Sequence, residues 1–535
     1  MKVAVVGSGV SGLAATWLLN EYTDHEVHLY EADSRPGGHA NTVSFTIPGK
    51  EPVDVDTGFI VFNPDTYPNF LRFLRQYPPL RERIRETCMT FSVSRDAGAF
   101  EWAGTSLRAI FCQRSRLLDP RMWRLLYDVV RFNACAPRLL VERNRRRGDS
   151  YTEELSIGEY LRKEGYSNSF MDNYLIPMTA AIWSTPPDKC ALDFPARTLI
   201  QFMHNHHLLQ IISKPAWLTL EGGSQTYVKQ ILASLPASQL HLSTPVASVT
   251  SNPTDVNSSD GAGPLYSVEI TTSSDERKTY DHVILACHAD TSLAILRAGG
   301  GLTPDEERSL GAFGWSKNEA VLHCDERLMP IRRAAWSCWN YLTKSEQDSA
   351  GRTKANIDDV SLTYWMNDLQ HISMERHGPV FVTLNPPFEP HPKQVVGWYQ
   401  YDHPILGTEA VRAQEEMALI QHTRGISYAG AWLKYGFHED GFTSGLRAAA
   451  ALRKTTGDAT GAGAPFKIYD ADRSPGRSAV LLAGLFDAFE ASGLRAVLGI
   501  FLSWCLTLLR TIFSLAGFRL SSLNAELREE RRKVQ

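Results

Sequence analysis

Three glycines near the start of the chain have the spacing of a dinucleotide-binding turn. Gly7, Gly9 and Gly12 follow the apolar run 2–6, and the segment 11–20 continues with the apolar recurrence of a helix. The first glycine permits a tight turn, the second lets the backbone approach a pyrophosphate, and the third lets the helix pack close to the strand. Because the helix also points its first amides at the phosphates, we expect contacts from the whole turn, namely Gly7, Ser8, Gly9, Val10, Ser11 and Gly12.

A carboxylate at the end of the next predicted strand completes this pattern. The apolar segment 27–30 ends in Glu31, about 20 residues after the glycines, where a carboxylate accepts hydrogen bonds from ribose hydroxyls. A glycine motif alone is weak evidence, but here strand, turn, helix, second strand and acidic residue occur in order. The opening of the chain therefore predicts a nucleotide site and leaves NAD and FAD both open.

The composition narrows the class of protein. At 535 residues with a formal charge of -4, the chain is long enough for two or three domains and lacks the charge that would favour nucleic acid as a partner. Its eight cysteines form no CxxC pair and no zinc pattern, which favours a reducing, cytoplasmic compartment over a disulfide framework. The first predicted strand begins at Lys2, so we expect no N-terminal signal peptide.

Three separated motifs resemble those of the flavin-containing amine oxidase superfamily, whose members include monoamine oxidase, phytoene desaturase and protoporphyrinogen oxidase. The first is the opening turn with its extension EADSRPGG at 31–38. The second is TPV at 244–246 followed by HVILAC at 282–287, and the third is ISYAGAW at 426–432 with EDGFTSG at 439–445. The resemblance covers the chain to about residue 453 and implies a flavoenzyme that binds FAD.

The resemblance also implies which residues contact the cofactor. Glu31 and Ala32 would meet the ribose, Gly37 and Gly38 would wrap the flavin end, and the backbone of Val246 would meet the adenine.

The C-terminal motif would close on the phosphates and the flavin ring through Gly430, Asp440, Gly441 and Phe442, with a helix beginning near Gly441. The phrases GGHANTV, VDTGF, EGGSQTYV and YGFHEDG resemble a branch whose relatives occur fused to, or associated with, cyclopropane-fatty-acid synthases, which points to acyl lipid substrates by analogy. The first two phrases add His39, Thr57 and Gly58 to the expected cofactor-binding residues.

The candidate catalytic residues come from the same resemblance. Many amine oxidases place a lysine near the flavin, just before a strand of the substrate domain, and Lys317 or its neighbour Asn318 occupies a similar position. The aromatic residue that faces the flavin corresponds by spacing to Phe437 or His438, so the tyrosine cage of amine oxidases is not evident and an amine is disfavoured. The C-terminal motif contains no cysteine, so we expect noncovalent FAD.

The run HNHH at 204–207 could suggest a metal site. Only His204 and His207 share one face of a helix, and no third ligand is in phase with them. We therefore expect no metal, and interpret the run as polar groups of a substrate pocket or as a helix end.

The expected fold class is α/β, with a discontinuous Rossmann-like FAD-binding domain and an interleaved α+β substrate domain. Short aromatic strands between 300 and 415 indicate a sheet whose face lines an apolar pocket. We expect the FAD-binding domain at 1–95, 215–300 and 416–455, the substrate domain at 96–214 and 301–415, a linker at 456–478 and an apolar helical tail at 479–535.

The tail is apolar enough to interact with a membrane. Residues 496–518 are apolar except for Arg510, and a stretch of this length spans a bilayer. Its apolar side chains favour insertion by about -4 to -7 kcal/mol, against about +2.5 to +3.5 kcal/mol for a central arginine. Polar residues between Arg495 and Ser514 gather on one side, which also suits a helix lying in the interface. A transmembrane helix, an interfacial helix and a buried hairpin are all open, and we favour attachment to the cytoplasmic face of a membrane.

Together these observations predict an FAD-dependent oxidoreductase that dehydrogenates or desaturates a hydrophobic, lipid-like substrate. No second dinucleotide fingerprint follows, so oxygen or a quinone-type carrier is the expected electron acceptor. An amine oxidase is the second hypothesis. A flavin-free prenyl-lipid-binding protein of the Rab GDP-dissociation-inhibitor type, which shares this architecture, and a redox-neutral flavin isomerase are further alternatives.

Overall fold

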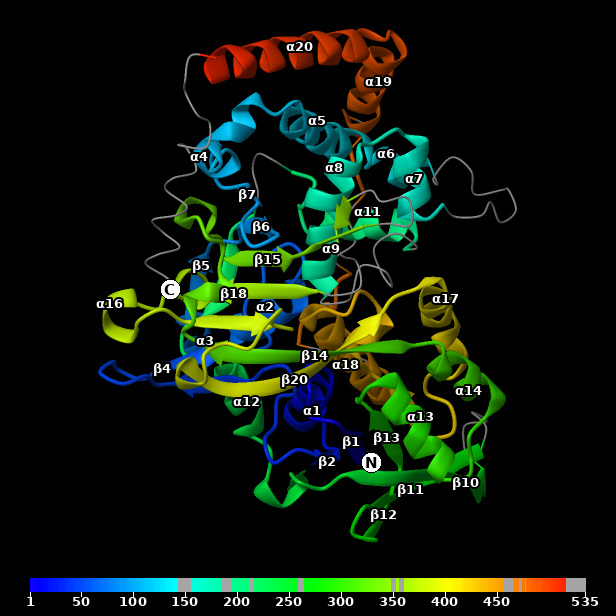
Figure 1. Cartoon of the computed structure of the whole chain (residues 1–535). Helices are drawn as coiled ribbons and strands as arrows, with labels where there is room; N and C mark the ends of the chain where they lie inside the picture. The colour runs from blue at the N-terminus through cyan, green and yellow to red at the C-terminus, as the bar shows by residue number, and fades with distance from the viewer. Residues whose placement is uncertain are drawn as a thin grey trace.

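The structure, a computed structural model, describes residues 1–142, 155–183, 194–210, 215–257, 264–347, 353–355, 360–455, 465–470, 474–476 and 478–515. Two large sheets organise this part of the chain, one of five strands and one of seven. Helices cover the seven-stranded sheet, and two C-terminal helices lie outermost over them (Figure 1).

The five-stranded sheet is built around the first strand of the chain. β1 (Lys2–Val6) lies between β13 (His282–Leu285) and β2 (Glu26–Tyr30), with β21 (Ile426–Tyr428) and β9 (Leu240–His241) at the edges. β1 is apolar because both of its faces are covered. Every pairing is parallel, so the carboxyl ends of strands from distant parts of the chain meet at one edge, where nucleotides bind in such sheets.

Different layers cover the two faces of this sheet. On one face α1 (Val10–Tyr22) packs against α18 (His438–Thr455), and Trp17 and Phe442 belong to the core between them. The other face packs against a small antiparallel sheet and three helices: β10 (Val246–Asn257), β11 (Pro264–Thr272), β12 (Arg277–Tyr280), α13 (Ala289–Ala298), α14 (Pro304–Gly311) and α17 (Thr408–Glu416). The predicted α/β class, with a Rossmann-like sheet assembled from separate parts of the chain, is confirmed.

The second sheet is mixed. Its strands, in spatial order, are β20 (Val395–Ile405), β14 (Gly314–His323), β19 (Phe381–Leu384), β18 (Ser361–Trp365), β15 (Trp339–Thr343), β6 (Phe91–Arg95) and β7 (Phe100–Ala103). All neighbours are antiparallel except β15 and β6. β6 belongs to this sheet, although its residues fall within the range 1–95 that we expected in the FAD-binding domain.

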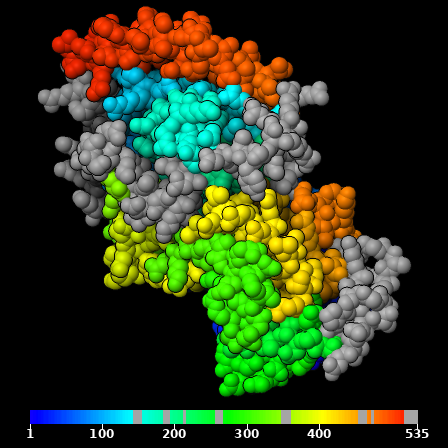
Figure 2. Space-filling model, turned by 90° about the vertical axis from the view of Figure 1, so that its right-hand side faces the viewer, coloured from blue at the N-terminus to red at the C-terminus, as the bar shows by residue number. Residues whose placement is uncertain are grey.

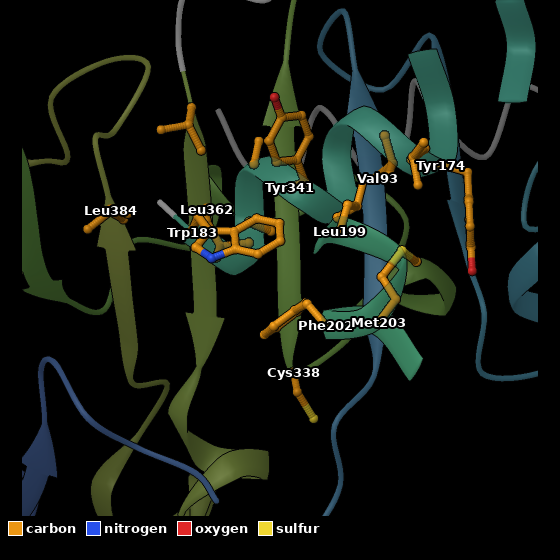
Figure 3. Packing of buried hydrophobic residues seen from close by; sticks show 14 of the residues in the cluster. Val93, Tyr174, Trp183, Leu199, Phe202, Met203, Cys338, Tyr341, Leu362 and Leu384 are labelled. Carbon is orange, nitrogen blue, oxygen red and sulfur yellow. The ribbon is translucent and has the colours of Figure 1, made fainter. Parts of the chain in front are cut away.

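Helices from the middle of the chain cover the second sheet. Side chains of α9 (Ile176–Trp183) and α11 (Ala196–Asn205), including Trp183, Phe202 and Met203, meet strand residues in one core (Figure 3). The remaining helices of this layer are α4 (Leu107–Ile110), the 3-10 turn η1 (Arg114–Leu118), α5 (Pro120–Cys135), α6 (Arg138–Glu142), α7 (Ile157–Lys163) and α8 (Asn168–Phe170).

Shorter elements lie along the chain between the strands of the two sheets. They include β3 (Thr42–Phe45), β4 (Val53–Asp56), α2 (Pro68–Gln76), α3 (Pro78–Arg81), β5 (Ile84–Thr87), β8 (Trp217–Leu220), α12 (Gln225–Leu232), β16 (Ser345–Gln347), β17 (Thr353–Ala355), α15 (Met366–Leu369) and α16 (Met374–His377). The buried carboxylate of Asp56 ties β4 to α12, accepting hydrogen bonds from the Ser224 amide at 2.9 Å and the Thr42 hydroxyl at 2.6 Å. Burial raises the pKa of Asp56 to about 6.

The predicted linker is not wholly separate from the globular part. Phe466 packs against Trp17 with ring centroids 6.1 Å apart, and the Tyr469 amide donates to Asn69 at 2.9 Å. α19 (Ser478–Ala491) and α20 (Leu494–Leu515) follow and contact α5. Among the described residues, α20 is the one helix long and apolar enough to cross a bilayer, by length and composition.

Candidate active site

The glycine turn at the end of β1 is shaped by close backbone packing. Gly7 has a φ of +101°, and a Cβ on Gly12 would lie 1.8 Å from the Gly7 carbonyl oxygen, so both positions need glycine. Gly9 differs, because no atom lies within 4 Å of the place where its Cβ would stand. Gly9, Val10 and Ser11 instead line a cavity at the start of α1. An open cradle bounded by backbone at a helix N-terminus fits a pyrophosphate.

Glu31 lies at the end of β2, as the sequence predicts. Its carboxylate accepts hydrogen bonds from the Ser8 amide at 2.8 Å, the Ser8 hydroxyl at 2.5 Å and the Asp33 amide at 2.8 Å. The Thr244 amide donates to the Glu31 carbonyl oxygen at 2.8 Å, which brings the segment leading to Val246 beside it. Ala32 is exposed in the same loop. The structure thus brings the first two sequence motifs together.

The GGH segment folds back over the turn. The Gly37 amide donates to the Ser8 carbonyl oxygen at 3.1 Å, and a Cβ on Gly38 would lie 3.2 Å from the Gly9 Cα. The next residue, His39, lines the cavity, and its Nε2 is buried with no hydrogen-bond partner among the described residues. Such an orphaned polar atom fits a site that receives a polar ligand.

Two further residues that we expected at the cofactor site, Gly58 and Thr57, differ in position, because Gly58 lines the cavity and Thr57 does not. A Cβ on Gly58 would stand 2.4 Å from the His39 carbonyl oxygen, so only glycine allows this approach. The hydroxyl of buried Thr57 lies 2.6 Å from the Tyr401 hydroxyl and does not line the cavity. Burial, with the neighbouring rings of His403 and His288, holds the pKa of His39 well below its usual value.

The C-terminal motif closes the site from the other side. α18 begins at His438, three residues before the predicted start near Gly441. Its first turn follows the loop at 435–437 directly. A Cβ on Gly441 would stand 2.6 Å from Val10, and one on Gly445 would stand 2.0 Å from the Ser11 carbonyl oxygen, so α18 packs directly on the first turn of α1. Gly430 lines the cavity, and its amide donates to Ser444 at 2.9 Å.

Two residues of this motif, Asp440 and Phe442, make contacts within the protein and do not line the cavity. The Asp440 carboxylate accepts from the Phe437 amide at 3.0 Å and so fixes the loop that forms part of the cavity wall. The Phe442 side chain is fully buried between Trp17, Phe70 and Phe73, away from the cavity. Any contact of Phe442 with a cofactor would therefore come from its backbone.

One cavity of about 250 Å³ joins the glycine turn to the second sheet. Its phosphate end is lined by the glycine turn, His39, His288, Asp402, His403 and Gly430. Its aromatic end is lined by Met89, Trp183, Phe202, Trp217, Trp339 and Tyr364. Among the described lining residues there is no lysine or arginine, and Asp402 is the only carboxylate.

The cavity histidines are neutral at physiological pH. Burial lowers the pKa of His403 and of His206 to about 4, and that of His438 to about 3. Burial also lowers the pKa of His288, whose ring stacks on Trp315 at 3.8 Å. The site therefore offers neutral imidazoles, which both donate and accept hydrogen bonds.

The three candidate catalytic residues have different positions. Phe437 lines the cavity and stacks on Phe202 at 4.9 Å. His438 also lines the cavity, but its ring stacks on Phe59. Its Nε2 lies 2.7 Å from the Tyr227 hydroxyl, so this nitrogen is engaged in the core. Lys317 is exposed on β14 and does not line the cavity, because strand alternation turns its side chain away from the face that carries buried Asn318.

Sequence reasoning missed the residues that contact Asn318. Its side-chain nitrogen lies 3.0 Å from the Nδ1 of His403, which lines the cavity beside Asp402. His403 lies on β20, the edge strand of the second sheet, which pairs with β14. In the register of these two strands, His403 stands opposite Ser316. Burial alternates along the first half of β14 but not around His403 on β20, so no periodic signal in the sequence marks His403.

The HNHH run has no metal-binding geometry. His206 lines the cavity and its Nδ1 lies 3.0 Å from the Phe202 carbonyl oxygen, whereas His207 pairs with Asp65 at 2.7 Å. No group of three metal-ligating side chains occurs in the part of the chain that the structure describes.

Comparisons with known proteins identify the family. Residues 10–323 match the sequence profile of the flavin containing amine oxidoreductases. Solved structures with the same fold include a fatty acid isomerase from P. acnes (14% identity, TM-score 0.53, 85% of this chain and 98% of that one). Others are a cyclohexylamine oxidase from Brevibacterium oxydans IH-35A (12% identity, TM-score 0.54, 85% and 99%) and a putrescine oxidase variant (16% identity, TM-score 0.52, 85% and 99%).

A search of curated protein sequences gave no significant match. The glycine turn with its open cradle, the orphaned His39 nitrogen and the match over residues 10–323 agree on the cofactor. This chain belongs to the flavin-containing amine oxidoreductase family and is an FAD-dependent oxidoreductase.

Proposed function

We propose that this oxidoreductase dehydrogenates or desaturates a hydrophobic, lipid-like substrate whose reacting segment is uncharged. The observation that carries the proposal is the aromatic end of the cavity. It is continuous with the phosphate end, and its described lining includes no charged side chain. Apolar walls bind a neutral chain well, whereas a buried unpaired charge would be costly there.

The residues of this chain bind and orient the reactants. FAD, when bound, supplies the redox chemistry by accepting a hydride from the substrate. The glycine turn would hold the phosphates, Glu31 the ribose, and the backbone of Val246 the adenine. His39, with its orphaned Nε2, would donate to or accept from a polar group of the cofactor or substrate. We assign the flavin end to Gly37, Gly38, Gly430 and the Gly441 turn.

The aromatic residues would position the substrate and exclude water. Phe437 and Phe202 form a stacked wall, and Trp339 contributes a buried indole N–H with no hydrogen-bond partner among the described residues. His438 would keep this wall in place through its bond to Tyr227 rather than transfer a proton. Lys317 takes no part in this proposal.

Two alternatives keep some support. Amine oxidases occur among the similar structures, and the Asp402 carboxylate could pair with a cationic amine at the phosphate end. The fatty acid isomerase among them supports an acyl substrate and also a redox-neutral reaction. A flavin-free lipid carrier is the weakest alternative, because the chain belongs to a flavin-containing family.

We place the enzyme at the cytoplasmic face of a membrane, with noncovalent FAD and oxygen or a quinone as electron acceptor. The seven described cysteines are free thiols, which suits a reducing compartment, and α20 is the apolar element available for attachment.

An anaerobic bleaching screen tests the substrate class. The purified holoenzyme is mixed with neutral acyl lipids, long-chain fatty acids or long-chain amines, and flavin absorbance is followed. We expect bleaching by a neutral lipid and restoration by oxygen or a quinone. Bleaching by amines alone would contradict the proposal. Product formed without consumption of an acceptor would establish an isomerase instead, and a colourless protein that cannot be reconstituted with FAD would exclude the oxidoreductase.

A further inference from the structure

The outer face of α20 is a continuous apolar stripe. Exposed apolar side chains recur along it every three or four residues, which places them on one side of the helix: Val497, Phe501, Trp504, Leu508, Ile512 and Leu515. Trp504 is 76% exposed and Leu515 is 83% exposed. Leu506, on the opposite side, is buried. A helix that packs into the protein core buries its large apolar side chains, whereas α20 exposes them to solvent.

α20 is held flat against the protein by its neighbour α19. Glu490 of α19 accepts a hydrogen bond from the Tyr127 hydroxyl at 2.7 Å and lies 3.8 Å from the buried guanidinium of Arg131 on α5. Asp487 pairs with Arg138, and Arg495 at the start of α20 pairs with Glu490 at 2.7 Å. These contacts fix the helical pair on α5, and α20 forms the outermost layer in both views (Figures 1 and 2).

The elements beneath α20 carry positive charge. α20 contacts η1 and α5, and the segment 107–126, which contains η1 and the beginning of α5, has five arginines and one acidic residue. Arg116 pairs with Asp119 and Arg124 with Asp128. The other three, Arg108, Arg114 and Arg121, are exposed and form no ion pair among the described residues. Leu107 and Leu117 are exposed on the same segment.

We propose that the α20 stripe and the arginines of 107–126 form a docking surface for the headgroups and outer acyl chains of an anionic phospholipid bilayer, with α20 lying in the plane of one leaflet. An apolar helix face that lies over a segment with exposed arginines suits an interfacial helix, in which the stripe enters the acyl boundary and the arginines meet lipid phosphates. A spanning arrangement would require α20 to leave its contacts with α5 and η1. The proposal does not depend on the cofactor or the substrate.

Vesicle binding by the full-length holoenzyme tests the surface. We compare sedimentation with vesicles of phosphatidylcholine alone and of phosphatidylcholine with 30% phosphatidylglycerol, a fraction on the order of that in anionic membranes. We expect at least tenfold tighter binding to the anionic vesicles, weakened by salt. The variant Phe501→Ser/Trp504→Ser/Leu508→Ser should lose binding to both, and Arg108→Gln/Arg114→Gln/Arg121→Gln should lose only the anionic preference. Phe388→Ser, which changes an exposed aromatic residue on another element, should bind normally.

Flavin absorbance and thermal unfolding show whether each variant is folded. Binding that the stripe variant retains, or an equal affinity for the two vesicles, would overturn the proposal. A stable dimer in lipid-free buffer that the stripe variant dissociates would show instead that a second copy covers the stripe.

A depth measurement distinguishes a flat helix from a spanning one. Single cysteines at Leu494→Cys and Leu515→Cys, in a Cys88→Ser/Cys505→Ser background, carry a fluorophore that lipid-borne quenchers reach at known depths. We expect the two ends of α20 to report the same shallow depth. Ends at opposite leaflets would replace the interfacial helix with a transmembrane one.

Discussion

The two ends of the cavity are built in different ways. At the phosphate end, backbone meets backbone: α18 lies against the first turn of α1 so closely that a Cβ at Gly445 would stand 2.0 Å from a carbonyl oxygen. At the aromatic end, side chains from α9, α11 and the second sheet form the wall, and the backbone is hidden behind them.

This difference has a consequence for specificity. The glycine turn is a surface made of backbone and has no side chains to vary, so this part of the phosphate end is committed to one ligand shape. A wall of side chains can be changed one residue at a time without moving the scaffold. The protein thus keeps its cofactor site fixed while its substrate site is open to change.

The largest expected effect comes from breaking the backbone packing at the phosphate end. Gly12→Ala places a Cβ 1.8 Å from the Gly7 carbonyl oxygen, so the turn must open. We expect loss of bound FAD and a destabilisation of roughly 3 kcal/mol, measured by flavin absorbance and urea unfolding. The control is Gly484→Ala in α19, whose Cβ would meet nothing within 4 Å. A Gly12→Ala protein that keeps its FAD would refute this view of the turn.

The second effect separates the two ends. Leu208→Trp fills the aromatic end of the cavity and leaves the glycine turn untouched. We expect unchanged FAD content with kcat/KM lower by on the order of 100-fold, because even a displacement of about 1 Å can cost that much. The matched control is Leu419→Trp, at a position 60% exposed on the surface. Loss of FAD from the Leu208→Trp protein would show that the two ends are not independent.

The third effect concerns a buried carboxylate in the first turn of α18, the helix that packs on the first turn of α1. Glu439 accepts hydrogen bonds from the Asn69 and Phe70 amides at 2.8 and 2.9 Å, and burial raises its pKa to about 8. Since the folded protein holds this proton more tightly than the unfolded chain, the free energy of unfolding should fall as pH rises from about 5 to 8. One such group contributes a slope of at most about 1.4 kcal/mol per pH unit.

Glu439→Gln should remove this slope in urea titrations between pH 6 and 8. The slope below pH 6 that arises from Asp56, whose pKa burial raises to about 6, should stay. An unchanged slope above pH 6 would mean that Glu439 ionises in the folded protein as it does in water.

The smallest effect is expected at Lys317. Its side chain is exposed and outside the cavity, so Lys317→Met should change kcat/KM by less than about twofold. The neighbouring variant Asn318→Ala should have the larger effect, because it removes the partner of His403. A loss of activity confined to Lys317→Met in steady-state assays would restore the amine-oxidase-like role predicted from the sequence.

The sequence was most informative where the backbone itself is the binding surface. Gly7 and Gly12 are recognisable because only glycine fits a turn of that shape, Gly9 leaves the cradle open, and the order of strand, turn and helix is local in the chain. The fold class followed from this pattern, whereas FAD followed from the resemblance that the later motifs complete, and both are confirmed.

The aromatic end could not be assembled in the same way. Trp183, Phe202, Trp339 and Tyr364 come from two helices and two strands, and any aromatic residue can pack in a core. Lys317 shows the remaining difficulty: a shift of one position along β14 moves a side chain from solvent to the interior, and the sequence did not specify that phase.

The strand order also bears on how the chain is made. β1 leaves the ribosome well before its neighbours on one side, because β13 begins at His282 and the strand beyond it, β21, begins at Ile426. At roughly 5–20 residues per second, the wait for β13 is on the order of 15–55 seconds. Throughout that interval an apolar strand has one of its two edges unpaired. Newly synthesised chains should therefore depend on chaperones until the segment that contains β13 has emerged.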